Sequence, residues 1–348
     1  MKIIQSGTIF SPEIGHPYSE EYINNFNHAP NLVKLSKGKY MATWFSGPWE
    51  THPFQRILIS YFENNKWAEP QVVQNTIGAS NFDPAFVSSE NGIYLFYSTT
   101  RKFSPRLHGE KRGFLGTYYR YSSNLGKSWS KPCLLSVEYA CKSNGLRLKN
   151  GHLLLPVYST VSNRVGVFKS VDDGYSWELF VIDPINTSVA EPSIIEFTVG
   201  HIVMVARTKT GKLWLSESID NGENWTMPFS TEIISYNTPV SLLMNDDSLL
   251  VCYNYGNARD KLCLCSTKSL SFHWDKSVVV DQIKDSGYPT KSAIHYSGSD
   301  CAVTYPSMIN FDDSKIILAW TKYEINKDEH KGEILYCIIN SGKEFLNI

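Results

Sequence analysis

The sequence has no long apolar run and almost no net charge. No stretch of 18 apolar residues is available to cross a bilayer, and the residues after Met1 lack the apolar core of a signal peptide. We therefore expect a soluble, cytoplasmic protein, with a secreted form left open if a leader was removed. The net charge of −1 gives no support for a nucleic-acid partner or an anionic membrane surface.

Cysteine is present without the pattern of a disulfide framework or a metal site. The seven cysteines are an odd number with no framework spacing, and no Cys/His set has the spacing of zinc ligands. The histidines and carboxylates are scattered along the chain as well. We expect reduced, mostly buried thiols, no metal and no cofactor, and the oligomeric state stays open.

What the chain does contain is a repeated eight-residue pattern, Ser-x-Asp-x-Gly-x-x-Trp. Two copies are intact, at Ser170–Trp177 and Ser218–Trp225, and Ser122–Trp129 has Asn at the Asp position. Ser60–Trp67 and Ser266–Trp274 are looser copies. The last four motif tryptophans are 48, 48 and 49 residues apart, and a fixed period of this length is typical of solenoids, propellers or arrays.

The chemistry of the pattern predicts a hairpin turn. Asp172 and Asp220 can each accept hydrogen bonds from the N–H groups of their own turn, and the glycine supplies a positive φ. The tryptophan then folds back against the sheet as an apolar plug. We interpret these aspartates as structural and do not expect them to be catalytic.

A second periodic signal counts the repeating units. Six places have an apolar run, a turn residue and another apolar run; their centres are Gly38, Gly92, Gly151, Gly200, Asp247 and Asp313/Ser314. A proline lies eight residues before five of these centres, as Pro30, Pro84, Pro192, Pro239 and Pro306, and Gly145 takes that place in the remaining unit. Proline is tolerated at the first residue of a strand.

Six units of about four strands each predict an all-β protein. The fold class is a six-bladed β-propeller of four-stranded antiparallel blades, formed by residues 1–348 as a single domain. The N-terminal stretch Ile3–Phe10 precedes the first unit and the last unit is short of one strand. We expect that stretch to complete the last blade, which would remove an exposed sheet edge.

Polar residues lie just before the repeating prolines, where the innermost strands of a propeller open onto one face. In chain order they are His28, Asp83, Asn144, Glu191, Asn237 and Tyr305. An imidazole, two carboxylates, two amides and a phenol suit a pocket that recognises sugar hydroxyls and moves protons. The alternative is that they only hold water along the axis.

The repeats and the segment Glu191–Arg207 resemble the sialidase superfamily of glycoside hydrolases, the BNR-repeat or neuraminidase-like group with Asp-box turns. In that family a catalytic Glu opens an inner strand, and an Arg at the end of the next strand binds the substrate carboxylate; Glu191 and Arg207 match these positions. Val303–Ser307 is similar to the segment with the Tyr nucleophile, here Tyr305. The resemblance implies an exo-acting glycosidase for a glycan with an acidic or polar terminal sugar.

The chemistry of these side chains supports glycoside hydrolysis independently of the family resemblance. A phenol with a pKa of about 10 is a poor nucleophile unless a carboxylate takes its proton, and Glu191 beside Tyr305 would be that base. A neutral nucleophile also avoids repulsion from a substrate carboxylate. Arg207 could hold an anion through two parallel hydrogen bonds. The structural alternatives are an Arg207–Glu191 ion pair and a packed core tyrosine.

The sequence departs from the family at the arginines that clamp the substrate carboxylate. His28 stands where the family has the first of three arginines, and residues 237–241, at the start of the fifth unit, contain none. We therefore expect Arg207 to be the single clamp arginine, and a substrate other than sialic acid. Asn144, Asn237 and Arg147 are further candidates for substrate binding.

The family's acid/base Asp lies in the loop after the first hairpin, which is here Gly47–Pro53. This loop offers Glu50 or His52, and Asp83 is the third candidate proton donor. Trp49 in the same loop could stack on a sugar face.

Two other functions stay open at this point. In a polysaccharide lyase, Arg207 would neutralise a uronate carboxylate while His28 or Tyr305 removed the C5 proton. A non-catalytic glycan-binding or protein-binding propeller would keep the pocket without turnover.

Overall fold

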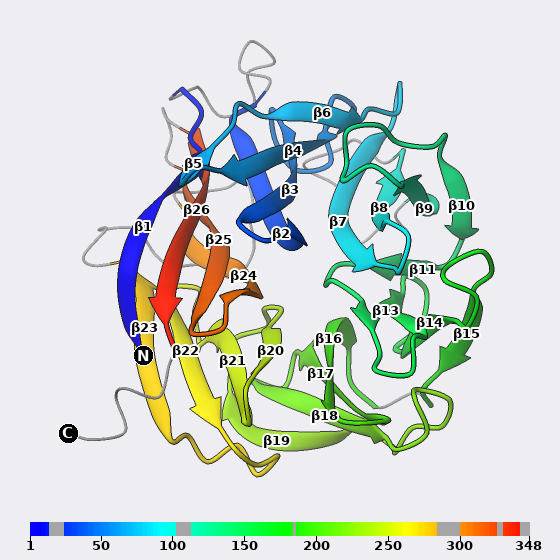
Figure 1. Ribbon diagram of the computed structural model, residues 1–348, viewed down its shortest axis with the longest axis vertical. Helices are drawn as coiled ribbons and strands as arrows, with labels where there is room; N and C mark the ends of the chain where they lie inside the picture. The colour runs from blue at the N-terminus through cyan, green and yellow to red at the C-terminus, as the bar shows by residue number, and fades with distance from the viewer. Residues whose placement is uncertain (14–23, 102–112, 184–185, 284–299, 326–329, 342–348) are drawn as a thin grey trace.

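The protein is an all-β propeller. The structure, a computed structural model, describes residues 1–13, 24–101, 113–183, 186–283, 300–325 and 330–341. In these ranges the chain forms six antiparallel sheets arranged as blades around a central axis (Figure 1), which confirms the predicted fold class. Within the same ranges no helix is long and apolar enough to cross a membrane.

Each blade is numbered here by its order in the chain, and its innermost strand is the first. Blade 1 has β2 (Phe26–Ser36), β3 (Lys39–Gly47) and β4 (Arg56–Glu63), with β5 (Lys66–Trp67) and β6 (Gln71–Gln74) on its outer edge. Blade 2 has β7 (Ser80–Ser88), β8 (Ile93–Thr100), β9 (Phe114–Ser122) and β10 (Cys133–Ser136). Blade 3 has β11 (Tyr139–Cys141), β12 (Leu146–Arg147), β13 (Leu153–Ser159), β14 (Val165–Ser170) and β15 (Glu178–Val181).

The second half of the chain repeats the arrangement. Blade 4 has β16 (Val189–Thr198), β17 (His201–Thr208), β18 (Lys212–Ser218) and β19 (Phe229–Ile234). Blade 5 has β20 (Ser241–Asn245), β21 (Ser248–Asn254), β22 (Lys261–Thr267) and β23 (Lys276–Gln282). Blade 6 has β24 (Asp300–Asp312), β25 (Lys315–Ile325), β26 (His330–Asn340) and β1 (Lys2–Phe10).

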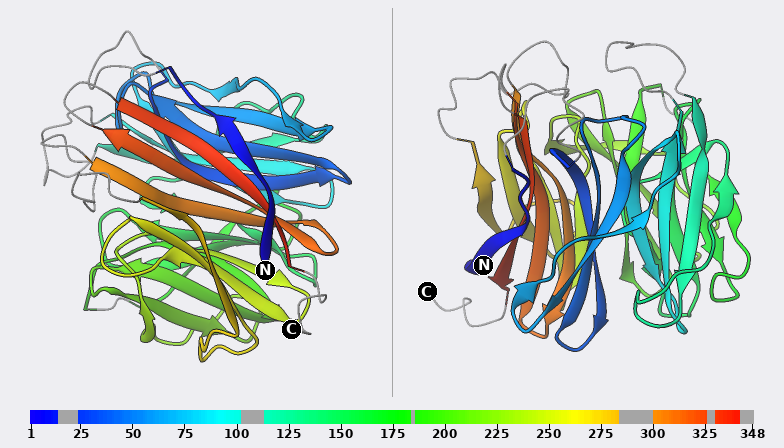
Figure 2. Two further views of the ribbon diagram at one scale, coloured as in Figure 1. Left: turned by 90° about the vertical axis from the view of Figure 1, so that its left-hand side faces the viewer. Right: turned by 90° about the horizontal axis from the view of Figure 1, so that it is seen from above.

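The two ends of the described chain meet in blade 6. Strand β1 pairs antiparallel with β26, from Lys2 opposite Asn340 to Phe10 opposite Ile334. Figures 1 and 2 show β1 running along the outer side of β26. The pairing closes the ring and covers the strand edge that β26 would otherwise expose.

Apolar side chains fill the spaces between neighbouring blades. One cluster, for example, joins Trp44 of blade 1 to Ile317 and Tyr336 of blade 6. The motif tryptophans pack against five different clusters and so act as the plugs predicted from the sequence; they are Trp67, Trp129, Trp177, Trp225 and Trp274. All seven cysteines are free thiols, and all except Cys133 are buried.

The motif turn is held by its own side chains and also joins two blades. Ser176 N donates to Asp172 Oδ1 at 2.9 Å, and Gly174 N, with φ of 96°, donates to Ser170 Oγ at 2.8 Å. The next residue, Asp173, accepts the N–H of Glu90 in blade 2 at 2.7 Å. The predicted structural role of the motif is therefore correct, and the turn adds a contact between blades.

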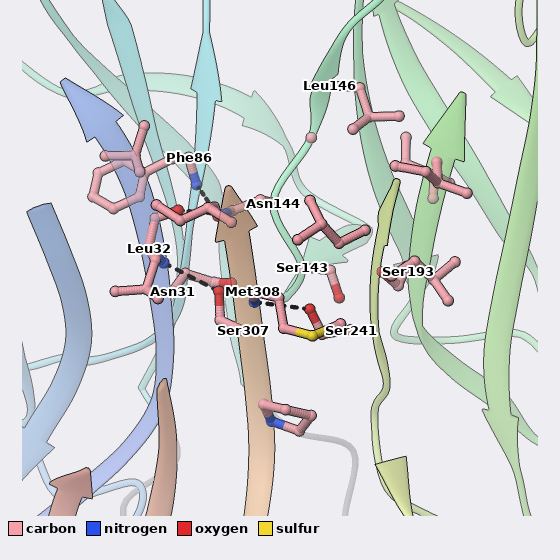
Figure 3. Close-up of a pocket in the computed structure, with 18 of the residues that line it drawn as sticks. Asn31, Leu32, Phe86, Ser143, Asn144, Leu146, Ser193, Ser241, Ser307 and Met308 are labelled. Carbon is pink, nitrogen blue, oxygen red and sulfur yellow. Dashed lines mark hydrogen bonds between the residues drawn. The ribbon is translucent and has the colours of Figure 1, made fainter. Parts of the chain in front are cut away.

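Side chains also join the innermost strands of different blades around the axis. On this side, within the described residues, an innermost strand has no partner strand of its own sheet. Leu32 N in blade 1 donates to Ser307 Oγ of blade 6 at 3.1 Å, and Met308 N donates to Ser241 Oγ of blade 5 at 3.0 Å (Figure 3). Asn31 Nδ2 donates 2.7 Å bonds to carbonyls in blades 2 and 3. Because a buried backbone group without a partner is unfavourable, these bonds fix the axial ends of the blades.

Removing one motif carboxylate should loosen one blade without changing the fold. In Asp220→Ala, three backbone and side-chain donors at Glu223 and Asn224 lose their acceptor. We expect the free energy of unfolding to fall by about 1–2 kcal/mol, measured by urea unfolding at pH 7. Glu178→Ala, at an exposed carboxylate outside the turn, is the control, and an equal loss there would contradict the assignment.

Candidate active site

The inner strands of four blades carry the same kink. Residues Ala29, Asp83, Glu191 and Tyr305 have positive φ values of 49–58°, and each comes directly before a proline at a bulge in the strand pairing. A left-handed non-glycine residue is uncommon, and a residue before proline is normally extended. Such a conformation costs about 1–3 kcal/mol and persists where the surrounding fold imposes it.

The kinks bring chain-distant polar side chains to one cavity on the axis. Its volume is about 480 Å³, and it is lined by pre-proline residues together with groups from the neighbouring strands and loops. The predicted site residues among its lining are His28, Glu50, Asp83, Glu191, Arg207 and Tyr305. The structure therefore gathers predicted groups from blades 1, 2, 4 and 6 in one cavity, whereas Asn144 and Asn237 are not among its lining residues.

The centre of the cavity is a chain of three contacts. Tyr305 Oη donates to Glu191 Oε1 at 3.1 Å, and Arg207 Nη2 donates to the same oxygen at 2.8 Å. Arg207 Nη1 donates to the backbone oxygen of Asn237 at 3.0 Å. Glu191 is only 4% exposed, and its second oxygen, Oε2, has no hydrogen-bond partner within the described structure.

Burial keeps the phenol protonated in this arrangement. It raises the pKa of Tyr305 above its ordinary value, and the negative charge of Glu191 raises it further. Burial alone would lower the pKa of Arg207, but Glu191, together with Tyr305, Tyr158 and Asp83, outweighs it and the pKa is raised. The resting site therefore has a neutral phenol that donates to a carboxylate, beside a permanently charged guanidinium.

Two further groups in the cavity have strongly shifted pKa values. The His28 ring lies 4.1 Å from the Tyr305 ring, and burial, followed by nearby Arg259, lowers the pKa of His28 well below 6.5. Burial, followed by the charge of Glu191, raises the pKa of Asp83 well above its ordinary value. The imidazole is therefore neutral, and the Asp83 carboxyl is favoured in its protonated form.

A second arginine belongs to the site, and the sequence interpretation missed it. Arg259, between β21 and β22, is 6% exposed and places its guanidinium carbon 5.5 Å from the centre of the Tyr305 ring. Arg259 Nη2 lies 3.4 Å from the backbone oxygen of Asn237, which Arg207 also contacts. The expectation of a single arginine is wrong, because this side chain enters from a loop and not from the strand start at residues 237–241.

The loop Gly47–Pro53 contributes Glu50 to the cavity lining, but not its two aromatic candidates. The rings of Trp49 and His52 lie edge to face, 4.2 Å apart, and His52 Nδ1 accepts the N–H of Phe54 at 3.0 Å. His52 is 1% exposed. A catalytic role for His52 and sugar stacking by Trp49 stay predictions.

Asn144 and Arg147 lie elsewhere along the axis. They line a second cavity of about 270 Å³, formed farther along the same inner strands (Figure 3). Asn144 Oδ1 accepts the N–H of Phe86 at 2.8 Å, and its Nδ2 donates to the oxygen of Leu32 at 2.6 Å. Arg147 pairs with the exposed Glu90 at 2.8 Å. Asn237 contacts Arg207 and Arg259 through its backbone oxygen.

Solved structures of sialidases share this fold. NanB sialidase from Streptococcus pneumoniae superposes with a TM-score of 0.74 and 16% identity, over 96% of this chain and 70% of that one. The leech intramolecular trans-sialidase gives 0.72 and 15%, over 97% and 70%. The intramolecular trans-sialidase from Ruminococcus gnavus gives 0.70 and 15%, over 98% of both chains. The chain therefore has the same six-bladed propeller fold as these solved structures.

The family of this chain follows from its match to a family sequence model. Residues 38–318 match the family described as "BNR repeat-like domain", and the chain belongs to this family. A stretch of 140 residues is 29% identical to the anhydrosialidase of Macrobdella decora. That stretch is 36% of this chain and spans only 18% of the relative's length.

The environment of His28 predicts that its imidazole stays neutral. Because its pKa is lowered well below 6.5, the ring should take up no proton as the pH falls from 8 to 5. Imidazole resonances in two-dimensional NMR should therefore not shift for His28, and a His28→Gln variant assigns the signal. Free histidine in the same buffer is the titrating control. A midpoint for His28 near 6.5 would contradict the described environment.

Proposed function

We propose that this protein is a sialidase-like, exo-acting glycoside hydrolase for a glycan with an acidic terminal sugar. The observation that carries the proposal is the 3.1 Å contact between Tyr305 Oη and Glu191 Oε1, in a cavity lined by Arg207 and with Arg259 packed over the Tyr305 ring. A packed core tyrosine has no need of a buried carboxylate partner. A phenol that acts as a nucleophile does need one.

The contact defines the first chemical step. Glu191 accepts the phenol proton while Tyr305 Oη attacks the anomeric carbon and the bond to the leaving oxygen breaks. A carboxylic acid gives its proton to that oxygen, so the aglycone leaves as an alcohol. Water then attacks the anomeric carbon and gives its proton to the carboxylate left by the acid, the glycosyl–Tyr305 bond breaks, and Glu191 returns its proton to the phenol oxygen. Two displacements at one carbon retain its configuration.

The anionic part of the substrate is assigned to the arginines. The Nε groups of Arg207 and Arg259 are buried and have no hydrogen-bond partner in the described structure. Buried donors are normally paired, so a ligand that supplies oxygen acceptors would satisfy them. A carboxylate fits this need because guanidinium groups bind it with charge-assisted hydrogen bonds. The neutral His28 adds no third cation at this end.

Asp83 and Glu50 are the two proton donors available on the cavity wall. Asp83 is supported by its raised pKa, which keeps the carboxyl protonated at a pH where an ordinary aspartate is ionised. Glu50 is supported by its place in the loop that carries the acid in the family. A comparison of substrates with different leaving groups distinguishes Asp83 from Glu50.

The nucleophile pair is tested with a fluorogenic aryl glycoside of N-acetylneuraminic acid, because Arg259 beside Arg207 removes the ground for expecting a substrate other than sialic acid. Tyr305→Phe and Glu191→Gln should each lower kcat by a factor on the order of 10³ or more, because one lacks the nucleophile and the other its base. Tyr97→Phe, at a buried tyrosine outside the cavity, should keep its activity. Hydrolysis that survives in Tyr305→Phe would sink the assignment.

The acid is tested by changing the leaving group. Asp83→Asn and Glu50→Gln are compared on an aryl glycoside, whose leaving oxygen needs little protonation, and on an alkyl glycoside, which needs a proton. The variant without the acid should lose roughly 10²-fold or more in kcat on the alkyl substrate, and far less on the aryl substrate. Equal losses on both substrates would assign that residue to binding.

The neutral His28 ring against Tyr305 is the one observation that favours a lyase, since a base that removes a C5 proton must be unprotonated. A uronic-acid oligosaccharide incubated with the protein distinguishes the two reactions. A lyase generates an unsaturated product that absorbs in the ultraviolet, and a hydrolase does not. The hydrolase proposal expects no such band.

A further inference from the structure

A buried lysine, Lys142, lies over the face of the Tyr305 ring. Lys142 follows β11 in blade 3, is 1% exposed, and places its ammonium nitrogen 5.1 Å from the centre of the Tyr305 ring. Its backbone oxygen accepts Asn31 Nδ2 at 2.7 Å. The neighbouring Cys141 Sγ lies 3.6 Å from the backbone oxygen of Asp83. Blades 1 and 2 therefore fix the start of this side chain.

The surroundings of Lys142 differ from those of a lysine that only stabilises the fold. Lys169, also in blade 3 and 3% exposed, pairs with Glu223 Oε1 at 2.6 Å. For the ammonium of Lys142, the described residues supply no ion pair within 4.0 Å, and its close contact is the face of an aromatic ring. Burying a charge in this way is unfavourable unless the charge is used or compensated.

We propose that Lys142 is a positioning residue that stabilises the negative charge formed on Tyr305 as Glu191 takes its proton. This inference rests on the proposed hydrolase mechanism. A cation over an aromatic face is attracted by the ring's electrons, and the attraction grows when the phenol becomes a phenolate. Lys142 therefore favours the reacting state over the resting state, which is the condition for accelerating a step.

Among the described residues, blade 1 supplies no cation near Tyr305, because His28 stands where the family has an arginine, and Lys142 of blade 3 places a cation there instead. With a neutral His28, the cations near Tyr305 are Arg207, Arg259 and Lys142, from blades 4, 5 and 3. Arg207 is committed to Glu191 at 2.8 Å, so the two cations over the ring are Lys142 and Arg259. The charged and titratable groups that surround Lys142 from every packed element are His28, Asp83, Glu191, Arg207, Arg259 and Tyr305.

The kinetic test compares Lys142→Met and Lys142→Arg with the matched control Lys169→Met, on the aryl sialoside. Lys142→Met should lower kcat roughly ten- to thirtyfold with little change in KM, because charge stabilisation is lost only in the reacting state. Lys142→Arg should restore most of kcat. Lys169→Met should lose stability and keep its kcat. A change in KM without a fall in kcat would overturn the proposal. An equal fall in kcat in Lys169→Met would overturn it as well.

The pH profile gives a signature that a structural role would not produce. Burial lowers the pKa of Lys142 from 10.5 to about 8, against the opposing charges of Glu191 and Asp83. The ammonium is present below this pH and lost above it, so kcat should fall as the pH rises through about 8. In Lys142→Arg the guanidinium stays charged, and the alkaline limb should move upward. An alkaline limb that stays at the same pH in Lys142→Arg would contradict the proposed role of Lys142.

A spectroscopic test needs no turnover and so separates this inference from the proposed activity. Tyr305 is replaced by 3-nitrotyrosine, whose phenol ionises at a much lower pH and absorbs visible light as the phenolate. Lys142→Met should then lower the ionisation constant of the nitrophenol roughly tenfold or more, and Lys169→Met should leave it unchanged. Equal values in all three proteins would overturn the role of Lys142, whether or not the aryl sialoside is hydrolysed.

Discussion

The kink before the axial prolines is the constraint on which the site depends. A regular inner strand would point successive side chains to opposite faces of its own blade. The left-handed residue breaks this alternation at Asp83, Glu191 and Tyr305, and the three side chains line one cavity. The kink is unfavourable for the chain alone, and side-chain hydrogen bonds between the blades hold the inner strands in place.

Charge is the second organising feature, because four ionisable groups of the cavity are buried: His28, Asp83, Glu191 and Tyr305. Glu191 is tolerated there since it accepts from Tyr305 and Arg207, and removing either partner would leave charge without compensation. The same burial makes His28 neutral and favours the proton on Asp83. In the proposed mechanism, these buried side chains serve as the base, an acid and the neutral nucleophile.

Much of this could be predicted from short patterns. The tryptophan period and the proline offset predicted six blades, and the pre-proline rule brought Asp83, Glu191 and Tyr305 together. The rule worked less well in blade 3, where Gly145 takes the place of the repeating proline: Asn144 lies farther along the axis, beside the second cavity. Arg259 was missed because it comes from a loop between two strands, where no periodic signal reports its direction.

The sequence by itself determined the turns and the number of blades; the prolines that it placed at strand starts lie inside β2, β7, β16 and β24, where the structure has the kinks. Glycine, proline and a turn aspartate act on backbone only a few residues away, so local chemistry is sufficient for these features. Only the tertiary structure decided that Glu191 meets Tyr305, 114 residues later, and that Lys142 lies over the same ring. Those contacts and the shifted pKa values arise from ring closure and desolvation by several blades at once, which no local segment can encode.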